Sequence, residues 1–336
     1  MAAKRRVKRL IRKLPVAVTV TLAIIFIVYA ALSYVDYHEV DIGFDIDLGG
    51  ANLFRLGGDN GEETEEKQTL EKVEVPVPED GQVMFHFIDV GQGDAILVTT
   101  PDGNMLIDTS IKAVREDLVN YLDAAGVKEL EYLVLTHPDA DHIGNADYII
   151  ENYDVKNILL PDCVSSSKTY ERMIDAMEKS DAKVMVPEVG YTFKLGALVN
   201  TVIAPLKEYD DPNEMSIVIK SVFGETSVML TGDAEVESEG DIVATWNKAD
   251  LDCDILKIGH HGSRTSTTDD FLAAVSPEIA IISCGEGNSY GHPHEETVQK
   301  LDEEKIPLYR TDDYGDIVII TDGKTYEVIT ENKIDK

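Results

Sequence analysis

The chain has 336 residues, of which 43% are hydrophobic and 28% charged, and these proportions are typical of a globular protein and exclude a wholly disordered one. The formal net charge of −33 favours solubility and disfavours tight binding to nucleic-acid phosphates, unless bound divalent cations reverse the local field. Three widely spaced cysteines, Cys163, Cys253 and Cys284, argue against a disulfide framework or a zinc knuckle, and we expect them to act as small buried hydrophobic residues.

The N-terminus predicts a membrane anchor. Residues 1–13 carry seven basic side chains, and residues 14–35 form an uncharged apolar run long enough for the ~20 residues that a helix needs to cross a bilayer. We expect residues 1–13 in the cytoplasm, residues 14–35 as a single-pass transmembrane signal anchor in the cell membrane, and the C-terminal domain outside the cell. The alternative is a signal peptide with secretion after cleavage, since Tyr29-Ala30-Ala31 contains small residues. The length of the apolar run favours the retained anchor.

Residues 36–80 predict an acidic, flexible tether. The stretch from residue 57 to residue 80 is polar, acidic and free of aromatic residues, so it cannot bury enough apolar surface to offset its ordering entropy. The remaining residues, 81–336, hold 20 basic and 49 acidic side chains, a net charge of −29, so the acidity of the chain belongs mainly to its folded part.

Residues 81–336 show strand and helix patterns along their whole length. Short apolar or alternating runs bounded by turn residues predict strands, and apolar residues at helical spacing predict helices between them. Hairpins mixed with αβ units predict an α/β domain with two sheets sandwiched between helices, whose site lies in loops at the C-terminal ends of strands. We expect strands at 82–90, 95–100, 105–110, 132–136, 155–161, 182–187, 191–205 (a hairpin), 216–224, 227–233, 254–263 (running into a loop), 279–285, 307–311, 316–323 and 325–330, and helices at 113–125, 146–153, 168–181, 268–276 and 293–305.

Residues 136–145, Thr-His-Pro-Asp-Ala-Asp-His-Ile-Gly-Asn, follow an apolar run and predict a metal-binding loop. Imidazole and carboxylate groups are ligands for Zn, Mn and Fe, and a loop at a strand end can aim several of them inward. The alternative, that these residues only cap the next helix, is weakened by four ligand-type side chains within six positions: His137, Asp139, Asp141 and His142.

Four more histidines cluster in two later loop motifs, His260 and His261 in Gly-His-His-Gly-Ser and His292 and His294 in Gly-His-Pro-His. Packing alone does not explain six of the eight histidines in three loop motifs. A fourth motif places Asp233 after an apolar strand and a glycine that permits a tight turn. An aspartate there can bridge two metal ions, or it can simply complete the turn.

The motifs FIDVGQGDAILV, LIDTS, LTHPDADHIGN, MLTGD, LKIGHHGS and NSYGHPH resemble, in this order, those of the metallo-β-lactamase-fold hydrolases, and more closely those of the hydrolase domain of ComEC-type competence proteins. The resemblance spans about residues 83–322. It implies a four-layer αββα sandwich for residues 81–336, preceded by one transmembrane helix. ComEC-type proteins are multi-spanning membrane channels for DNA uptake, whereas this chain resembles a stand-alone, membrane-anchored copy of the domain. A role in DNA uptake is therefore not carried over.

The superfamily signature His-x-His-x-Asp-His reads His137-Pro138-Asp139-Ala140-Asp141-His142 in this chain. Aspartate therefore stands at the second histidine position. The resemblance implies two metal positions with a bridging aspartate, and the implied ligands are His137 and Asp139 at the first position, Asp141, His142 and His261 at the second, and Asp233 as the bridge.

The first metal position departs further from the family pattern. The superfamily places another histidine between His142 and Asp233, and this sequence has none there. Asn213 and Ser216 are weak substitutes. Because a carboxylate replaces an imidazole, the ligand set is harder, and its preference shifts from Zn toward Mn or Mg. We expect one or two divalent metal ions, Zn or Mn, with Mg possible.

The resemblance also implies metal-assisted hydrolysis, in which a bound water loses a proton near neutral pH and the metal stabilises charge on a phosphoryl oxygen. Asp139 or Asp141 orients that water or accepts its proton, and His292 is a candidate catalytic proton donor with helix capping as its alternative role. The candidate substrate contacts are Ser263, Asn288, Tyr290, His260 and Asn213.

Other polar residues are expected to have structural roles. His86 lies in an alternating strand pattern and is expected to be a satisfied core residue. Hydrogen bonds to loop amides are expected to brace the fold through Asp89, Gln92, Asp94 and Asp108.

These observations predict an extracytoplasmic, membrane-anchored, metal-dependent hydrolase, namely a phosphodiesterase and specifically a DNase. Its expected partners are a phosphodiester substrate such as DNA and the membrane, with no protein partner. Two alternatives remain open at this stage: a hydrolase of nucleotides or small phosphoesters, which the charge of −29 favours, and a non-catalytic surface binding module with a degenerate metal site.

Overall fold

The computed structural model describes residues 75–332. Within this part of the chain, no helix is both long enough and apolar enough to cross a membrane. The predicted cytoplasmic segment 1–13, the transmembrane segment 14–35 and residues 36–74 of the predicted tether lie outside the described residues, so these predictions stay predictions.

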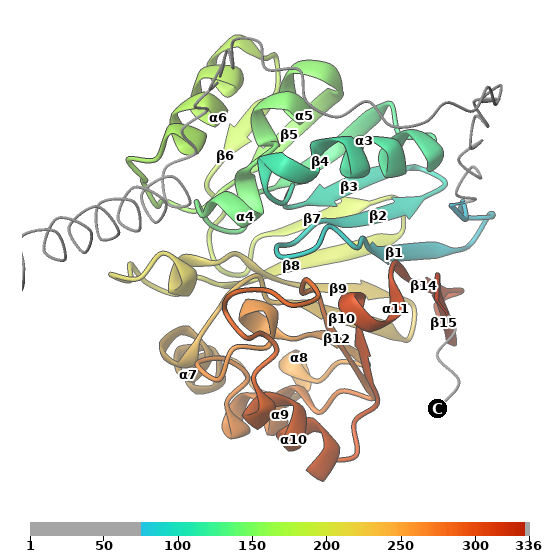
Figure 1. Cartoon of the computed structure of the whole chain (residues 1–336). Coiled ribbons are helices and arrows are strands. Elements are labelled where there is room, and N and C mark those ends of the chain that lie inside the picture. Colours follow the sequence, from blue (N-terminus) through green and yellow to red (C-terminus); the bar gives the residue numbers. More distant parts are fainter. Residues whose placement is uncertain (1–74, 333–336) are drawn as a thin grey trace, which may run out of the picture. The chain divides into compact units, whose positions relative to one another are not determined.

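Two mixed β-sheets form the centre of the described domain (Figure 1). The first sheet has eight strands in the order β15-β14-β1-β2-β3-β4-β5-β6. Its strands from β15 to β3 pair antiparallel, and those from β3 to β6 pair parallel. The bounds are β1 (Val83–Phe87), β2 (Ile96–Thr100), β3 (Gly103–Ile107), β4 (Glu129–Val134), β5 (Asp154–Leu159), β6 (Lys183–Met185), β14 (Ile317–Thr321) and β15 (Tyr326–Thr330).

The second sheet has seven strands in the order β13-β12-β11-β10-β9-β8-β7. It repeats the plan of the first sheet, because β7 to β10 pair antiparallel and β10 to β13 pair parallel. Parallel neighbours need a crossover, which helices supply in both sheets. The bounds are β7 (Thr192–Leu195), β8 (Leu198–Ala204), β9 (Val218–Phe223), β10 (Thr226–Leu230), β11 (Ile255–Lys257), β12 (Ile279–Ile282) and β13 (Leu308–Arg310).

Helices cover the outer face of each sheet (Figure 1). On the first sheet lie α3 (Arg115–Ala124), α4 (Ala140–Ile143), α5 (Ala146–Asn152) and α6 (Lys168–Lys179). On the second sheet lie α7 (Val236–Thr245), α8 (Lys248–Leu251), α9 (Asp269–Val275) and α10 (Glu295–Glu303). The remaining short elements are α11 (Thr311–Tyr314) and the 3-10 turns η1 (Lys112–Val114), η2 (Asn213–Met215) and η3 (Gly259–Gly262).

Three hydrophobic cores separate these four layers. Alternate strand residues point to opposite faces of a sheet, so Phe85 and Phe87 of β1 join the core between the two sheets. Leu97 of β2 faces the core under the helices of the first sheet, and Leu256 of β11 faces the core under those of the second sheet. Strands buried on both faces account for the long apolar runs in the sequence. The predicted αββα arrangement is therefore confirmed.

Four helices were not predicted from the sequence, namely α4, α7, α8 and α11, and α7 is the longest of them. The apolar pattern of α7 is weak, since Ile242 is its one buried apolar side chain. Glu214, which is distant in the sequence, accepts hydrogen bonds from the backbone N–H groups of Glu235, Glu237 and Ser238. These donors at a helix N-terminus have no partner within the helix. The cap at the N-terminus of α7 is thus a tertiary contact.

The predicted core role of His86 is confirmed. Its Nδ1 lies 3.0 Å from the Tyr121 hydroxyl and its Nε2 lies 3.0 Å from Thr99 Oγ1. Burial lowers the pKa of His86 to about 3, so the ring is neutral. Of the three cysteines, all free thiols, Cys253 and Cys284 are buried as expected, whereas Cys163 is only partly buried.

Candidate metal centre

The loops that follow four strands carry the chemistry. The first histidine motif follows β4, Asp233 follows β10, the paired histidines follow β11, and the Gly-rich loop follows β12. All four strands take part in parallel pairs, and such sheets place their sites at the C-terminal strand ends. Gly232 adopts a left-handed φ of 53° and packs against Thr136 and Ser216, which allows the turn that presents Asp233.

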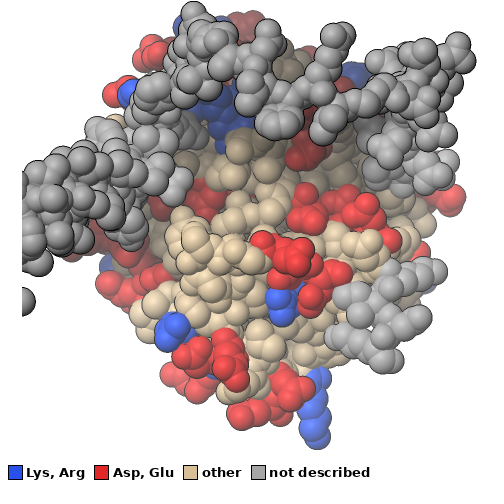
Figure 2. Space-filling view, in the orientation of Figure 1, with Lys and Arg blue, Asp and Glu red and all other residues tan. Residues whose placement is uncertain are grey.

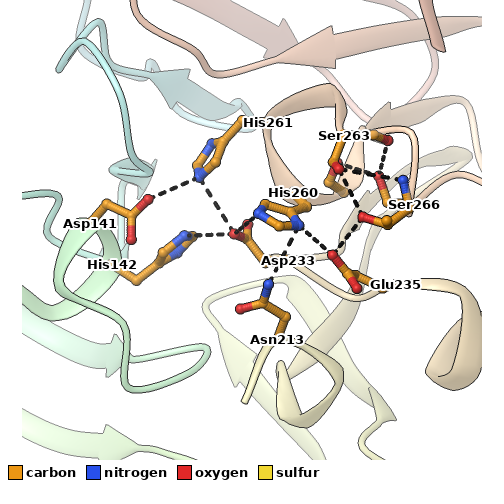
Figure 3. Close-up of polar contacts among 12 residues, drawn as sticks. Asp141, His142, Asn213, Asp233, Glu235, His260, His261, Ser263 and Ser266 are labelled. Atoms are coloured by element: carbon orange, nitrogen blue, oxygen red, sulfur yellow. Dashed lines mark hydrogen bonds and ion pairs between the residues drawn. The ribbon is translucent and has the colours of Figure 1, made fainter. Parts of the chain in front are cut away.

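His142 and His261 contact the carboxylate of Asp233, and Asp141 contacts His261 (Figure 3). The Nε2 atoms of His142 and His261 lie 3.3 Å and 3.5 Å from Asp233 Oδ2. His261 Nε2 also lies 3.4 Å from Asp141 Oδ2. Ligands at ~2.0–2.1 Å from a tetrahedral metal ion are about 3.3 Å apart, so these separations match a ligand set.

Several buried polar atoms at this point have no hydrogen-bond partner. They are Nε2 of His137, His142 and His261 and Oδ1 of Asp233. Buried polar atoms without partners are costly, and imidazole nitrogens with carboxylates are the donors that Zn and Mn bind. The residues present therefore fit a divalent metal ion held by donors from two overlapping groups, Asp141 with His142 and His261, and His137 with His142 and Asp233.

Outer contacts aim the histidines at this point. Asp108, directly after β3, accepts hydrogen bonds from Thr136 N (2.8 Å) and Thr136 Oγ1 (2.6 Å), and its Oδ2 lies 2.7 Å from His142 Nδ1. His261 Nδ1 donates to the carbonyl of Ser283 at 2.9 Å. Such contacts fix the tautomer and leave Nε2 free to bind a metal. Asp108, expected only to brace loop amides, orients an imidazole as well.

The carboxylates are held ionised by the imidazoles around them. Burial alone would raise the pKa of Asp233, but His142 and His261 outweigh it and hold that pKa well below its ordinary value. Asp141 shows the same balance, because burial is again outweighed by His261 and His142. Burial alone would lower the pKa values of His142 and His261, but Asp233 and the other carboxylates raise them, so the cluster favours positive charge and a metal ion would bind there with release of protons from these rings.

The His137 side of the centre is poorer in donors. His137 Nε2 lies 4.0 Å from Asp233 Oδ2, while Nδ1 contacts Thr136 Oγ1 at 3.2 Å and Ser216 Oγ at 3.3 Å. Ser216 Oγ also accepts from the backbone N–H of Asp233. Burial lowers the pKa of His137 to about 3, which keeps the ring neutral and able to bind a metal. Ser216 thus lies beside His137, whereas Asn213 does not.

Asp139 does not join the close cluster of donors. It is exposed at the N-cap position of α4, makes no side-chain cap hydrogen bond, and belongs to none of the close donor groups among the described residues. Partial burial of its carboxyl, then the charge of Asp141, raise the pKa of Asp139. Its roles as ligand and as proton acceptor remain predictions.

His260 belongs to a separate polar network beside the cluster (Figure 3). Its Nδ1 lies 2.5 Å from Glu235 Oε1, and its Nε2 lies 3.8 Å from Asp233 Oδ2. Thr265 donates to the same Glu235 oxygen, and the Ser263 hydroxyl lies 2.7 Å from Thr265 Oγ1. Asn213 Nδ2 lies 3.4 Å from His260 Nδ1. The sequence analysis missed Glu235, although it directly extends the Thr-Gly-Asp motif by two residues.

The Gly-rich loop places His292 and Tyr290 next to His260. His292 is 8% exposed, and its ring centroid lies 5.2 Å from that of His260. Tyr290 is 65% exposed and stacks on His292 at 5.7 Å. Asn288 braces this loop, since its Oδ1 accepts from the backbone N–H groups of Tyr290 and His292. Burial, then the nearby His260, lower the pKa of His292 to about 4.

The His294 side chain does not cap the helix beside it, because it makes no cap hydrogen bond. It occupies the N-cap position of α10, and its Nδ1 accepts from the backbone N–H of Arg264 at 3.0 Å. Away from the cluster, Gln92 accepts from Gly285 N, and the Asp89 backbone N–H donates to Asp316. These contacts brace loops.

A buried ion pair beneath the cluster was missed by the sequence analysis. Lys257, the last residue of β11, pairs with Asp94 at 2.7 Å, and both side chains are buried. Burial alone would lower the pKa of Lys257, but Asp94 outweighs it and raises that pKa. A lysine within the apolar run Asp-Ile-Leu-Lys-Ile-Gly was the available signal.

Known proteins share this fold and these motifs. A family model described as the metallo-beta-lactamase superfamily matches residues 88–286. ComE operon protein 3 of Bacillus subtilis is 35% identical over 251 residues, which cover 68% of this chain and 32% of that protein. Competence protein ComA of Neisseria gonorrhoeae is 32% identical, covering 67% of this chain and 30% of its own length. Recombination protein 2 of Haemophilus influenzae is 31% identical, covering 67% and 27%.

The chain spans about a third of the length of these relatives. Their matches and the family model agree with the two-sheet fold and with the buried His/Asp donor cluster. The chain therefore belongs to the metallo-beta-lactamase superfamily and is related to these competence and recombination proteins.

Proposed function

We propose that this metal-dependent hydrolase is a phosphodiesterase that cleaves DNA outside the cell membrane. The observation that carries the proposal is the buried cluster of Asp141, His142, Asp233 and His261, whose free donor atoms converge beside a loop rich in polar and aromatic groups. When bound, a divalent ion supplies a water of lowered pKa and stabilises charge on a phosphoryl oxygen.

The chain's own residues have distinct roles in this proposal. Asp141 and Asp233 hold the ion through ionised carboxylates, and Asp108 orients the His142 ring toward it. Asp139 lies on the exposed side of the same loop and accepts the proton released during attack. His292, with the low pKa that its burial gives, contacts the substrate as a neutral ring.

The rim beside the cluster favours a nucleotide unit among phosphodiesters. Tyr290 offers an exposed ring on top of His292, and stacking on an aromatic ring is the sequence-tolerant way of holding a base. The Ser263 hydroxyl and the His260 ring lie nearby as hydrogen-bonding groups. Relatives named for competence and recombination also favour DNA.

The charge of the domain supports a second candidate, a hydrolase of nucleotides or other small phosphoesters. Residues 81–336 carry a net charge of −29, and Figure 2 shows acidic side chains across the displayed face with few basic ones. A long polyanion would be repelled by such a surface. Salt dependence separates the two candidates, because binding of a polynucleotide weakens steeply as salt rises and binding of a small ester does not.

The test is an activity matrix on the full-length chain. Mn²⁺, Zn²⁺ and Mg²⁺ are combined with single-stranded DNA, double-stranded DNA and bis-p-nitrophenyl phosphate. We expect metal-dependent cleavage that Asp141→Ala lowers by about 10³-fold, since several kcal/mol of charge stabilisation is lost. Asp175→Ala, an exposed change on α6, is the matched control and should be neutral. Equal activity of Asp141→Ala, or no cleavage with any metal, would sink the proposal.

The location and catalytic competence are tested separately. The proposed anchor at 14–35 places the domain outside the membrane, so protease added to intact cells should degrade it, and a membrane fraction should contain the chain.

Metal content after purification without chelators addresses the non-catalytic alternative. Less than about one ion per chain would favour a binding module, since a catalytic site of this family type needs its metal.

A further inference from the structure

Lys257 has a position that the hydrolytic roles above do not explain. It is 0% exposed, which no other described lysine is, and it closes β11 just before the paired histidines. An ammonium group has three N–H donors and no acceptor. Its Nζ lies 2.7 Å from Asp94 Oδ2, and it donates to the carbonyls of Gly232 at 3.2 Å and Ile258 at 3.1 Å. All three donors therefore have acceptors.

Two of the three acceptors belong to segments that present a metal ligand. Gly232 directly precedes Asp233, and Ile258 begins the turn that carries His261. Asp94 links in a third such segment, because its backbone N–H donates to the carbonyl of Asp141, and its Oδ1 also lies 3.5 Å from His261 Nδ1. One ammonium group thus joins the loops from both sheets at the point where the donor atoms converge.

The pair also decides what Asp94 can do. Asp94 lies close enough to Asp233 and His261, and to Asp108 and His142, to form two alternative donor groups. An ion in either of them would be held away from Asp141. Lys257 Nζ lies 2.7 Å from Asp94 Oδ2 and balances the negative charge of that carboxylate. Asp94 therefore acts as an outer partner of the histidines and not as a metal ligand.

We propose that Lys257 is a positioning residue of the metal centre, which holds the loops of Asp94, Asp233 and His261 in register and keeps Asp94 from binding the ion itself. The inference rests on the proposed metal centre and not on the proposed substrate. It concerns binding of the metal alone, so its outcome is distinguishable from the presence or absence of phosphodiester cleavage.

The experiment measures metal binding by the full-length chain. Lys257→Met keeps the length and apolar stem of the side chain and removes the ammonium group. We expect its Zn²⁺ affinity, from competition with a chelating dye, to fall about 10–100-fold, as is typical when partners of metal ligands are lost. The absorption spectrum of bound Co²⁺ should also change, because the ligand geometry changes. Asp94→Asn tests the same contact from its other end and should act in the same direction.

Lys220 offers a matched control. Its Nζ donates to the carbonyls of Asp250 and Asp252, so it also ties loops together, but away from the metal ligands. Lys220→Met should alter thermal unfolding while leaving Zn²⁺ affinity and the Co²⁺ spectrum unchanged. Wild-type affinity and spectrum in folded Lys257→Met would overturn the proposal. If Lys257→Met does not fold, wild-type values in Asp94→Asn would overturn it equally.

Discussion

Carboxylates gather in several places among the described residues, and two of these places differ in their chemistry. At the metal centre, imidazoles outweigh burial and hold the pKa values of Asp141 and Asp233 below their ordinary values. In the cluster of Asp316, Asp89 and Glu331, the surroundings are backbone donors and other acids. Burial, followed by the charges of Glu331 and Asp89, raises the pKa of Asp316 to about 7. Acidity alone therefore does not make a cation site, whereas carboxylates facing converging imidazoles do.

The largest expected effect comes from removing the shared carboxylate of the centre. Asp233→Asn keeps the side-chain shape but removes the charge that four histidines face. We expect loss of bound metal and a fall in kcat/KM of about 10³-fold, since several kcal/mol of charge stabilisation disappears. Metal content by mass spectrometry and hydrolysis rates check this. Asp316→Asn is the control, and equal losses in both variants would abolish the distinction between the two places.

The next effect is expected from the outer carboxylate. Asp108→Asn leaves the ligands in place but weakens the contact that orients His142. We expect metal affinity to fall about 10–100-fold with little change in the helical content of the protein. Titration with Zn²⁺ and a competing chelator measures the affinity, and circular dichroism monitors the fold. An unchanged affinity would show that the Asp108 contact is not needed to orient His142 for metal binding.

A smaller effect is expected on the poorer side of the centre. His137 lies 4.0 Å from Asp233 and belongs to the donor group with His142 and Asp233, but not to the group that contains Asp141. We expect His137→Ala to weaken binding of the one metal ion that binds most tightly by no more than about 10-fold, or ~1.4 kcal/mol. His142→Ala should abolish that binding. Calorimetric titration gives affinity and stoichiometry for both variants, and matching losses would mean that the two sides are equivalent.

The smallest effect concerns stability and pH. Because the pKa of Asp316 is raised to about 7, the folded protein holds this proton more tightly than the unfolded chain does. The resulting stabilisation is full below about pH 4 and is lost as the pH rises through about 7. Asp316→Asn keeps an acceptor for Asp89 N and removes the charge. Its free energy of unfolding should therefore fall less between pH 5 and pH 8, by on the order of 1 kcal/mol after solvent screening.

Urea unfolding at the two pH values measures that difference. Parallel pH profiles for the variant and the wild type would show that Asp316 ionises normally. They would also remove the contrast with the metal centre, where burial is outweighed by imidazoles. The metal content of Asp316→Asn should match that of the wild type in either case.

The features that local pattern determines were predictable. Apolar runs bounded by turn residues gave the strands, and His137, Asp141, His142 and His261 were identified because ligand-type residues rarely crowd into loops by chance. Asp139 was grouped with them by its place in the same loop motif and by the family resemblance, and its role as a ligand stays a prediction. A strand-end loop turns successive side chains in different directions, and Asp139 lies on its exposed side.

The features that depend on distant contacts were not predictable. Lys257 reads as one polar residue in an apolar strand until the fold brings Asp94 against it. Glu214 caps α7 from another part of the chain. Such partners are set by the packing of two sheets, which no local pattern records.

The pairing of β1 with β14 has a consequence for the order of events in the cell. Val83 of β1 pairs with Thr321 of β14, so β1 completes its pairing only after a strand some 240 residues later in the chain has been synthesised. All the metal ligands are synthesised before β14 exists. Until then β1 has an open edge, and the loop that carries Asp94 lacks its final support. Because such long-range pairing is slow, we expect hydrolytic activity to appear only after β14 has been synthesised and paired.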